Sequence, residues 1–249
     1  MYAFTNQTIL LTGATGGIGQ ALAHQLTQQG AHVLATGRAE LPLQSLAATA
    51  PDQITQIVAD LNTRTGRNHI IAVAQTHPLT GVIHNAGLQL ETNFATNNAP
   101  DNAPDNAPDV TSEIAVNLQA PLHLTAALLP HLSGPAPFLS FITSSLVLAP
   151  KQDAPIYCAT KAGLHSFTRA LGYQCAQSRP DVLINEVFPA LVDTPMTAGR
   201  GSGKDSPETV AIAILKGLQN RRTETWVGKA RLLRLLNLLC PPLVAKILK

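Results

Sequence analysis

Short apolar runs alternate with longer stretches of helical periodicity along most of this chain. A strand followed by a helix of about ten or more residues and then by another strand forms a crossover unit, which joins parallel strands of one sheet. The alternation therefore predicts an α/β protein built on a parallel sheet. Strands are expected at 7–11, 32–36, 54–59, 82–83, 137–143, 182–188 and near Trp226, and helices at 18–29, 41–50, 63–75, 110–131, 156–178 and 206–220.

The composition is that of a packed globular protein. Of the 249 residues, 45% are hydrophobic and 13% are charged, which excludes a disordered chain. No linker divides the sequence, so we expect one domain over residues 1–249. The formal net charge is only +2, and no basic cluster is interleaved with aromatic residues. A nucleic-acid partner is therefore not expected.

Cysteine and histidine spacing argues against disulfides and metals. The three cysteines, Cys158, Cys175 and Cys240, are far apart, and the eight histidines show no ligand spacing. We therefore expect reduced thiols and no metal. The first residues lack a basic stretch followed by a long apolar core, so no signal peptide and a cytoplasmic location are expected.

One segment breaks the alternation of strands and helices. Residues 98–109 contain the sequence NAPD three times, and prolines at this density prevent regular structure. We interpret 91–109 as a loop insertion of low complexity. A solvated loop is the simpler interpretation, and a flap over a nearby site is the alternative.

The C-terminal segment, 229–249, is basic and amphipathic, and a helix is predicted there. An apolar stripe at helical spacing is formed by Leu232, Leu235, Leu236 and Leu239, and the basic residues are Lys229, Arg231, Arg234, Lys246 and Lys249. Pro241 and Pro242 interrupt the helix and limit its length. The stripe is interpreted as docking on the body of the protein or on a partner subunit. Weak contact with an anionic membrane surface is the alternative.

A glycine-rich loop lies between the first predicted strand and the first predicted helix. Glycines allow the backbone to turn sharply and to approach a pyrophosphate, and the N-terminus of the next helix attracts that phosphate. The loop lacks the Gly-Lys-Ser/Thr ending of a P-loop for nucleoside triphosphates. We therefore expect a dinucleotide cofactor. Its candidate contacts in the loop are Gly13, Thr15, Gly16, Gly17, Ile18 and Gly19.

The end of the second predicted strand indicates which dinucleotide binds. Proteins that prefer NAD place a carboxylate there to hold the ribose hydroxyls. This chain has Thr36 and Gly37, followed by Arg38, and no acid before Glu40. A guanidinium matches a phosphate in shape and charge. NADP(H) is therefore favoured, with NAD(H) as the alternative.

Tyr157 and Lys161 are four residues apart, which places them on one face of a predicted helix. A neighbouring ammonium favours the phenolate form and lowers the pKa of a tyrosine from its usual value of about 10. Ser144 and Ser145 end the preceding strand, where ligands of parallel sheets collect. A serine hydroxyl there would hold a carbonyl oxygen while Tyr157 delivers a proton.

Together these motifs resemble the short-chain dehydrogenase/reductase family along nearly the whole chain. Thr12, Gly13, Gly17 and Gly19 match its TGxxxGxG loop, and Tyr157 with Lys161 matches its YxxxK motif. The remaining matches are Asp60 and Leu61, Asn85-Ala86-Gly87, Asn117, Ser145, and the segment from Phe188 and Pro189 to Val192, Asp193 and Thr194.

The resemblance implies a doubly wound Rossmann fold, with about seven parallel strands and helices on both faces of the sheet. It also implies that Tyr157 is the general acid/base, assisted by Lys161, Ser145 and Asn117. The cofactor would be held by the loop glycines and by Arg38, Asp60, Leu61, Asn85, Ala86, Gly87, Tyr157, Lys161, Pro189, Val192 and Thr194. The expected substrate is a small carbonyl compound or secondary alcohol, and the expected assembly is a homodimer or homotetramer.

The chain departs from the family pattern at three places. His84 replaces the first asparagine of NNAG, and Ala190 replaces the glycine of a Pro-Gly pair. Tyr157 follows Ser145 by 12 positions and Ser144 by 13, whereas 13 from the second serine is usual. Ser145 is favoured as the active serine because it ends the pair, and Ser144 is the alternative. A non-catalytic NADP(H)-binding regulator on the same fold is the second functional hypothesis.

Overall fold

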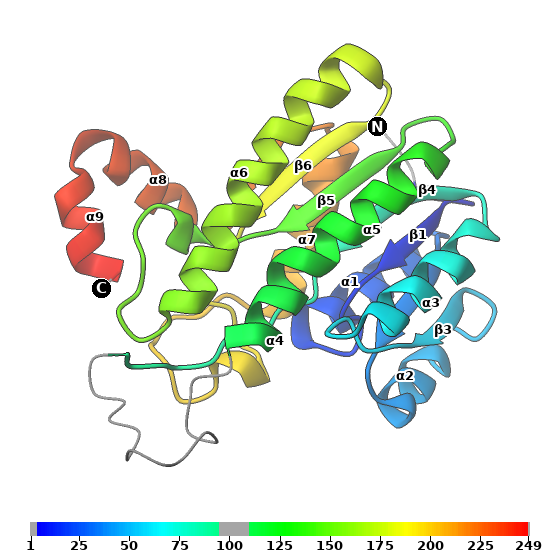
Figure 1. The fold of residues 1–249 in the computed structure, drawn as a ribbon, viewed down its shortest axis with the longest axis horizontal. Helices are drawn as coiled ribbons and strands as arrows, with labels where there is room; N and C mark the ends of the chain where they lie inside the picture. The colour runs from blue at the N-terminus through cyan, green and yellow to red at the C-terminus, as the bar shows by residue number, and fades with distance from the viewer. Residues whose placement is uncertain (1–3, 95–109, 249) are drawn as a thin grey trace.

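The computed structural model describes residues 4–94 and 110–248. Within this part of the chain, seven strands form one sheet in the order β3-β2-β1-β4-β5-β6-β7, and every neighbouring pair is parallel (Figure 1). The strands are β1 (Thr8–Leu11), β2 (His32–Gly37), β3 (Ile54–Val58), β4 (Leu79–His84), β5 (Phe138–Ile142), β6 (Leu183–Phe188) and β7 (Glu224–Trp226).

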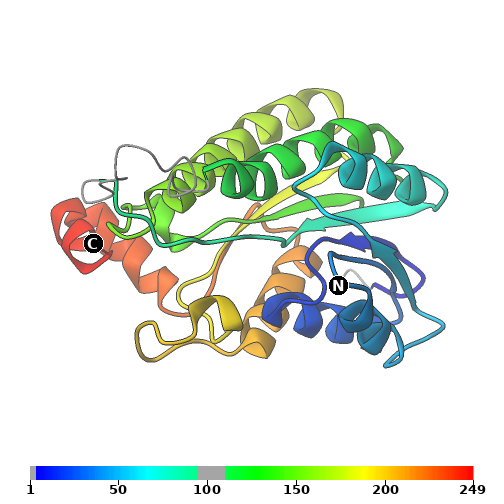
Figure 2. The same cartoon turned by 60° about the horizontal axis from the view of Figure 1, so that its bottom comes forward.

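Helices cover both faces of the sheet, as the doubly wound fold requires (Figure 2). Leu22, Leu43 and Ile214 belong to the core on one face, and Ile70, Leu124 and Leu164 belong to the core on the other. The first face is covered by α1 (Gly17–Gln28), α2 (Glu40–Ala47) and α7 (Pro207–Gln219). The second is covered by α3 (Arg64–Gln75), α5 (Ala120–Leu128) and α6 (Pro155–Ser178).

Strand burial follows position in the sheet. Every residue of β1, β4, β5 and β6 is buried, whereas the edge strands β3 and β7 carry exposed positions. A strand that is covered on both faces is mostly apolar, and this explains the short apolar runs in the sequence. β1 and β4 lie side by side at the centre, and their connections run to opposite faces of the sheet. A crevice therefore opens at their carboxyl ends.

Two expected helices differ from the prediction. The single helix expected at 110–131 is α4 (Val110–Ile114), a π-helical turn η2 (Ala115–Gln119), α5 and a final 3₁₀ turn η3 (Leu129–His131). The C-terminal helix is two helices, α8 (Ala230–Leu239) and α9 (Pro241–Leu248), because Pro241 cannot continue the hydrogen bonding of α8. The NAPD repeats and Lys249 lie outside the described residues.

Candidate functional site

The loop between β1 and α1 packs its backbone against the segment that follows β4. Gly13 has a φ of +65°, and a Cβ there would lie 2.8 Å from Cα of Ala86. A Cβ on Gly19 would collide with the carbonyl oxygen of Gly13. Glycine is therefore required at both positions, because neither has room for a Cβ. Gly13 also has a left-handed backbone conformation. α1 begins at Gly17, and its first N–H groups lack intrahelical partners.

Hydrogen bonds join this loop to the end of β4. Oγ1 of Thr12 accepts from the N–H groups of Asn85 (3.0 Å) and Ala86 (3.1 Å). In return, Nδ2 of Asn85 donates to the carbonyl oxygens of Thr12 and Gly13, both at 3.0 Å. These contacts hold both sides of the central crevice in place.

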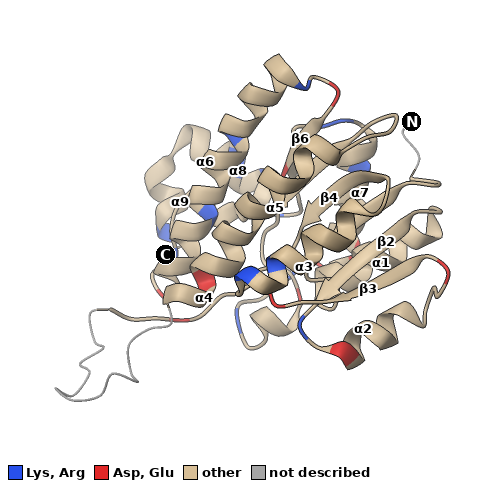
Figure 3. Ribbon diagram, turned by 45° about the vertical axis from the view of Figure 1, so that its right-hand side comes forward, with Lys and Arg blue, Asp and Glu red and all other residues tan. Residues whose placement is uncertain are grey.

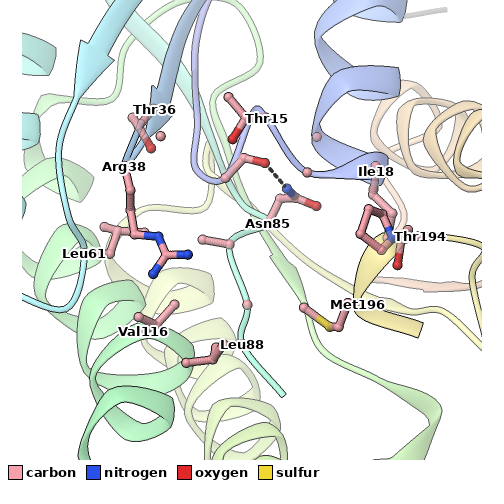
Figure 4. Close-up of a pocket in the computed structure, with 18 of the residues that line it drawn as sticks. Thr15, Ile18, Thr36, Arg38, Leu61, Asn85, Leu88, Val116, Thr194 and Met196 are labelled. Atoms are coloured by element: carbon pink, nitrogen blue, oxygen red, sulfur yellow. Dashed lines mark hydrogen bonds between the residues drawn. The ribbon is translucent and has the colours of Figure 1, made fainter. Parts of the chain in front are cut away.

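A cavity of about 400 Å³ occupies the crevice. Figure 4 shows Arg38 and Leu61 on one side of it and Thr194 and Met196 on the other. Most of the expected cofactor contacts line it: Gly13, Thr15, Gly16, Gly17, Ile18, Gly19, Arg38, Asp60, Leu61, Asn85, Ala86, Gly87 and Thr194. The structure therefore brings together residues that are up to 181 positions apart in the sequence, from Gly13 to Thr194.

Arg38 follows β2 and lines the cavity. Its side chain is exposed and forms no hydrogen bond or ion pair with the described residues. The one carboxylate among the lining residues is Asp60, whose Oδ1 accepts from the N–H of Asn62 at 2.9 Å. A free guanidinium at this place suits an anionic group better than a ribose diol.

His84 ends β4 in place of the asparagine of the family pattern. Its ring is buried, stacks on Phe141 with 4.7 Å between ring centroids, and has Nε2 3.2 Å from Oγ1 of Thr125. Burial lowers its pKa to about 3, so the ring is neutral. His84 therefore supports the sheet below the crevice and does not line the cavity.

Tyr157 lies in the first turn of α6, and Ser144 follows β5. The Ser144 side chain lies near the Tyr157 hydroxyl and lowers the pKa of the tyrosine. Oγ of Ser144 also accepts from the N–H of Leu146 at 3.1 Å, which caps the 3₁₀ turn η4 (Ser145–Val147). Ser145 is held by its backbone N–H, which donates to the carbonyl oxygen of Pro189 at 3.0 Å. The sequence pattern favours Ser145, but the structure places Ser144 against the Tyr157 hydroxyl.

Burial dominates the electrostatics of the tyrosine and lysine pair. It raises the pKa of Tyr157 to about 12, against the lowering effects of the nearby Ser144 side chain and the Arg200 charge. It lowers the pKa of Lys161 to about 8, against the charge of Glu186. The predicted lowering of the Tyr157 pKa by Lys161 is therefore wrong for this structure, because burial raises the pKa instead, and the phenol keeps its proton at neutral pH. In this state the hydroxyl is a proton donor.

The Lys161 ammonium is close to both the tyrosine and the cavity. Nζ donates to the carbonyl oxygen of Ile142 at 2.7 Å and lies 5.6 Å from the centroid of the Tyr157 ring. A Cβ built on Gly87 would lie 3.7 Å from this Nζ and 4.0 Å from Cε of Met196. Gly87 lines the cavity, so the lysine lies next to the cavity wall without being part of it.

Asn117 lies in the π-helical turn η2 and is fully buried. Its Oδ1 accepts from the N–H of Leu88 at 2.7 Å, and its Nδ2 donates to the carbonyl oxygen of Leu88 at 2.7 Å. Nδ2 also donates to Oγ1 of Thr160 at 3.2 Å. The side chain thus ties a cavity-lining segment to α6, one residue before Lys161.

Three loops meet through ion pairs. Nε of Arg200 lies 3.0 Å from Oε1 of Glu91, and Nζ of Lys151 lies 3.7 Å from the same oxygen. The segments after β4, β5 and β6 are therefore linked near Tyr157, whose pKa is affected by the Arg200 charge.

A family model described as short chain dehydrogenase matches residues 7–205. The chain belongs to the short-chain dehydrogenase family. An uncharacterised oxidoreductase of Bacillus subtilis (strain 168), DltE, is 35% identical to this short-chain dehydrogenase over 193 residues, which are 76% of this chain and 73% of the relative. The uncharacterised oxidoreductase SERP2049 of Staphylococcus epidermidis is 29% identical over 218 residues, 84% of this chain and 89% of the relative.

Solved short-chain dehydrogenases share the fold. The enzyme of Sphingobium yanoikuyae in complex with NADPH has a TM-score of 0.78 and 24% identity, covering 88% of this chain and 87% of that one. The enzyme of Burkholderia cenocepacia J2315 in complex with NADP has a TM-score of 0.84 and 20% identity, covering 99% of both chains. The enzyme of Burkholderia phymatum in complex with NAD has a TM-score of 0.82 and 19% identity, covering 96% of both chains.

Some expected contacts of this short-chain dehydrogenase are absent from the cavity wall, and others were missed. Pro189, Val192, Tyr157 and Lys161 are not among the residues that line the cavity. The residues without a prediction as cofactor contacts are Thr36, Gly37, Ala59, Leu88, Val116, Pro195 and Met196. Each of these residues is next in the sequence to a predicted contact, to a catalytic candidate or to another member of this set. Their position in the sequence is therefore the feature from which they could have been predicted. The described residues contain no group of three or more His, Cys, Asp or Glu side chains that could hold a metal.

Proposed function

We propose that this protein is an NADP(H)-dependent oxidoreductase that transfers hydride between the nicotinamide and a carbonyl or secondary alcohol substrate. The pair formed by the Ser144 side chain and the adjacent Tyr157 hydroxyl carries the proposal. It lies beside Lys161, whose Nζ approaches the glycine-walled cavity at Gly87. A regulator that only bound the nucleotide would need the cavity, but it would not need Ser144, Tyr157 and Lys161 side by side.

The residues of the crevice fit a dinucleotide. The cavity of about 400 Å³ falls in the usual range for small-molecule sites. Gly13 and Gly19 permit the close backbone approach that a pyrophosphate needs, and the N-terminus of α1 faces it. Arg38 suits a 2′-phosphate, which favours NADP(H). The structural neighbours bound to NADPH, NADP and NAD support this cofactor class.

The bound nicotinamide would supply or accept the hydride. In the reductive direction, the Ser144 hydroxyl orients the substrate oxygen by a hydrogen bond. Tyr157 donates its phenolic proton to that oxygen, since burial keeps the phenol protonated. The Lys161 ammonium favours the phenolate that remains. Asn117 fixes the position of α6 relative to the segment at Leu88.

The test is Tyr157→Phe in the purified full-length chain. Absorbance follows NADPH consumption with a panel of aldehydes and ketones and NADPH formation from NADP⁺ with secondary alcohols, and NADPH affinity is measured by fluorescence titration. The variant should lose about 10² to 10⁴-fold in kcat while its Kd for NADPH stays close to that of the wild type. Tyr173→Phe is the matched control, because Tyr173 lies on the same helix and is 64% exposed.

The outcomes separate the two functional hypotheses. Turnover by the wild type that persists in Tyr157→Phe would remove the assigned role of this tyrosine. Tight NADPH binding by a wild type that turns over no member of the panel would favour a non-catalytic NADP(H)-binding regulator.

A further inference from the structure

The face formed by α8 and α9 is apolar and uncovered among the described residues. Ala230 of α8 and Val244 of α9 are their buried residues. The exposed apolar side chains of this C-terminal face are Leu232 (67% exposed), Leu235 (59%), Leu238 (76%), Leu239 (85%), Leu243 (43%) and Ile247 (55%). The predicted docking of the leucine stripe on the body of the protein is therefore wrong for most of the stripe. Side chains this exposed need another partner if they are to be buried.

The same face is basic. Arg231 lies four residues before Leu235, and Arg234 lies four residues before Leu238, so each pair is adjacent on the surface of α8. Lys246 lies on α9, and no aspartate or glutamate follows Glu224 in the sequence. Figure 3 shows basic and no acidic residues on these two helices.

The body of the protein holds the two arginines at the edge of the leucines. Nη2 of Arg234 lies 2.9 Å from Oε2 of Glu224, and its guanidinium lies 5.2 Å from the centroid of the Trp226 ring. Nε of Arg231 donates to the carbonyl oxygen of Trp226 at 2.8 Å. Each arginine keeps further N–H donors, and Arg234 is half exposed, so both still present positive charge to solvent.

We propose that this C-terminal face binds the surface of an anionic lipid bilayer. An amphipathic helix with leucines on one side and arginine or lysine beside them lies in the interface, with its leucines among the acyl chains and its cations at the headgroups. No described helix is long and apolar enough to cross a membrane, and α8 has only 10 residues. The contact is therefore peripheral.

A second copy of the chain fits this face less well. A two-fold interface brings the same patch of both subunits together. Here it would bring Arg231, Arg234 and Lys246 of each copy toward those of the other, and the segment after Glu224 offers no acid to compensate. An anionic headgroup layer supplies the missing charge complement.

The bilayer would lie on the catalytic side of the molecule. α8 packs against η4, the turn that Ser144 caps, and α9 packs against α8. Figure 1 shows α8 and α9 beside the start of α6, away from α2 and α3. No residue of α8 or α9 lines the cofactor cavity, so the lipid contact does not depend on the proposed reaction.

The test is co-sedimentation of the full-length protein with large vesicles. One set contains phosphatidylcholine alone, and the other contains phosphatidylcholine with phosphatidylglycerol. The wild type should sediment with the anionic vesicles, and the bound fraction should fall as salt screens the attraction. The double variant Leu235→Asp, Leu239→Asp should lower the apparent affinity at least about tenfold, because it replaces two exposed leucines of the stripe by negative charges.

Leu41→Asp is the matched control. Leu41 is 75% exposed on α2. Its replacement is also an exposed Leu→Asp change, but it lies far from α8. This control should bind vesicles like the wild type, and equal melting temperatures of all three proteins establish that they are folded. Equal sedimentation of the double variant and the wild type, or none by the wild type, would overturn the proposal. Light scattering that shows a dimer dissociated by the double variant, without vesicle binding, would assign the face to a second copy instead.

Discussion

The side chain of Ser144 lies beside the Tyr157 hydroxyl and lowers the pKa of the tyrosine, whereas the neighbouring Ser145 has no such effect. We therefore predict that Ser144→Ala lowers kcat by about 10² to 10³-fold, as does the loss of one donor to a developing oxyanion. Ser145→Ala should stay within about threefold of the wild type, because the backbone N–H of Ser145, which the substitution keeps, makes its contact with Pro189. Steady-state kinetics of both variants with one accepted carbonyl compound decides between the two serines. The reverse ranking would return the role to Ser145.

Arg38 has a guanidinium with no described partner at the edge of the cavity. We predict that Arg38→Ala raises the Kd for NADPH by about 10 to 100-fold, the value of a lost charge-assisted hydrogen bond to a phosphate. The Kd for NADH should change by less than about twofold, since NADH lacks the 2′-phosphate. Fluorescence titration with both nucleotides provides the measurement. Arg169→Ala on α6 is the control, and equal losses for NADPH and NADH would show that Arg38 does not read the phosphate.

Gly16 and Gly19 differ in the space around them. A Cβ on Gly19 would collide with the Gly13 carbonyl oxygen and lie 2.9 Å from Cα of Ala14, whereas a Cβ on Gly16 would meet that oxygen at an ordinary 3.5 Å. Gly19→Ala should therefore destabilise the fold by about 1 to 3 kcal/mol through overpacking. Gly16→Ala should keep the melting temperature within about 2 °C of the wild type. Calorimetry without nucleotide checks both, and equal melting temperatures would contradict the assignment.

Glu186 is buried on β6, and its Oε2 lies 2.9 Å from Nδ1 of His165. Burial raises the pKa of Glu186 from 4.5 to about 7, although His165 and Thr143 act in the opposite direction. Between these two values the folded protein keeps a proton that the unfolded chain has lost. The contribution of this group to stability is therefore favourable at low pH and is lost as pH rises toward about 7.

Glu186→Gln removes this ionisation and keeps an oxygen that accepts from His165. The variant should gain stability relative to the wild type as pH rises from about 5 to 7.5. Melting temperatures across this range give the test. The exposed Glu208→Gln is the control and should leave the wild-type profile unchanged. Parallel profiles for wild type and Glu186→Gln would show that Glu186 does not ionise in this window.

The sequence predicted the sheet and the glycine loop well because both depend on local patterns. The prediction was poorer where tertiary contacts decide. β4 was expected only at Val82 and Ile83, since Thr80, Gly81 and His84 interrupt its apolar run, but β1 and β5 bury all six residues. The π-helical turn at Asn117 likewise accompanies side-chain bonds to Leu88, a residue 29 positions away.

The active serine and the pKa of Tyr157 could not be predicted from local sequence patterns, because both also depend on tertiary contacts. Spacing along the chain does not reveal that Ser144 caps the turn after β5 and so faces Tyr157. The sequence shows that Lys161 is near the tyrosine on one helix, but not that burial raises the pKa of Tyr157 and lowers that of Lys161. The sequence also could not show whether the leucine stripe is buried, because that depends on which elements pack against α8, and few do.

Thr12 and Asn85 join the two walls of the crevice by hydrogen bonds that involve no ligand. A nucleotide therefore enters a backbone whose shape is already set, and little ordering entropy is lost at that step. Association should then follow a single kinetic phase whose rate rises linearly with nucleotide concentration, with no slow isomerisation before or after binding. The half-life of the complex, and not the speed of its formation, would distinguish a good nucleotide from a poor one.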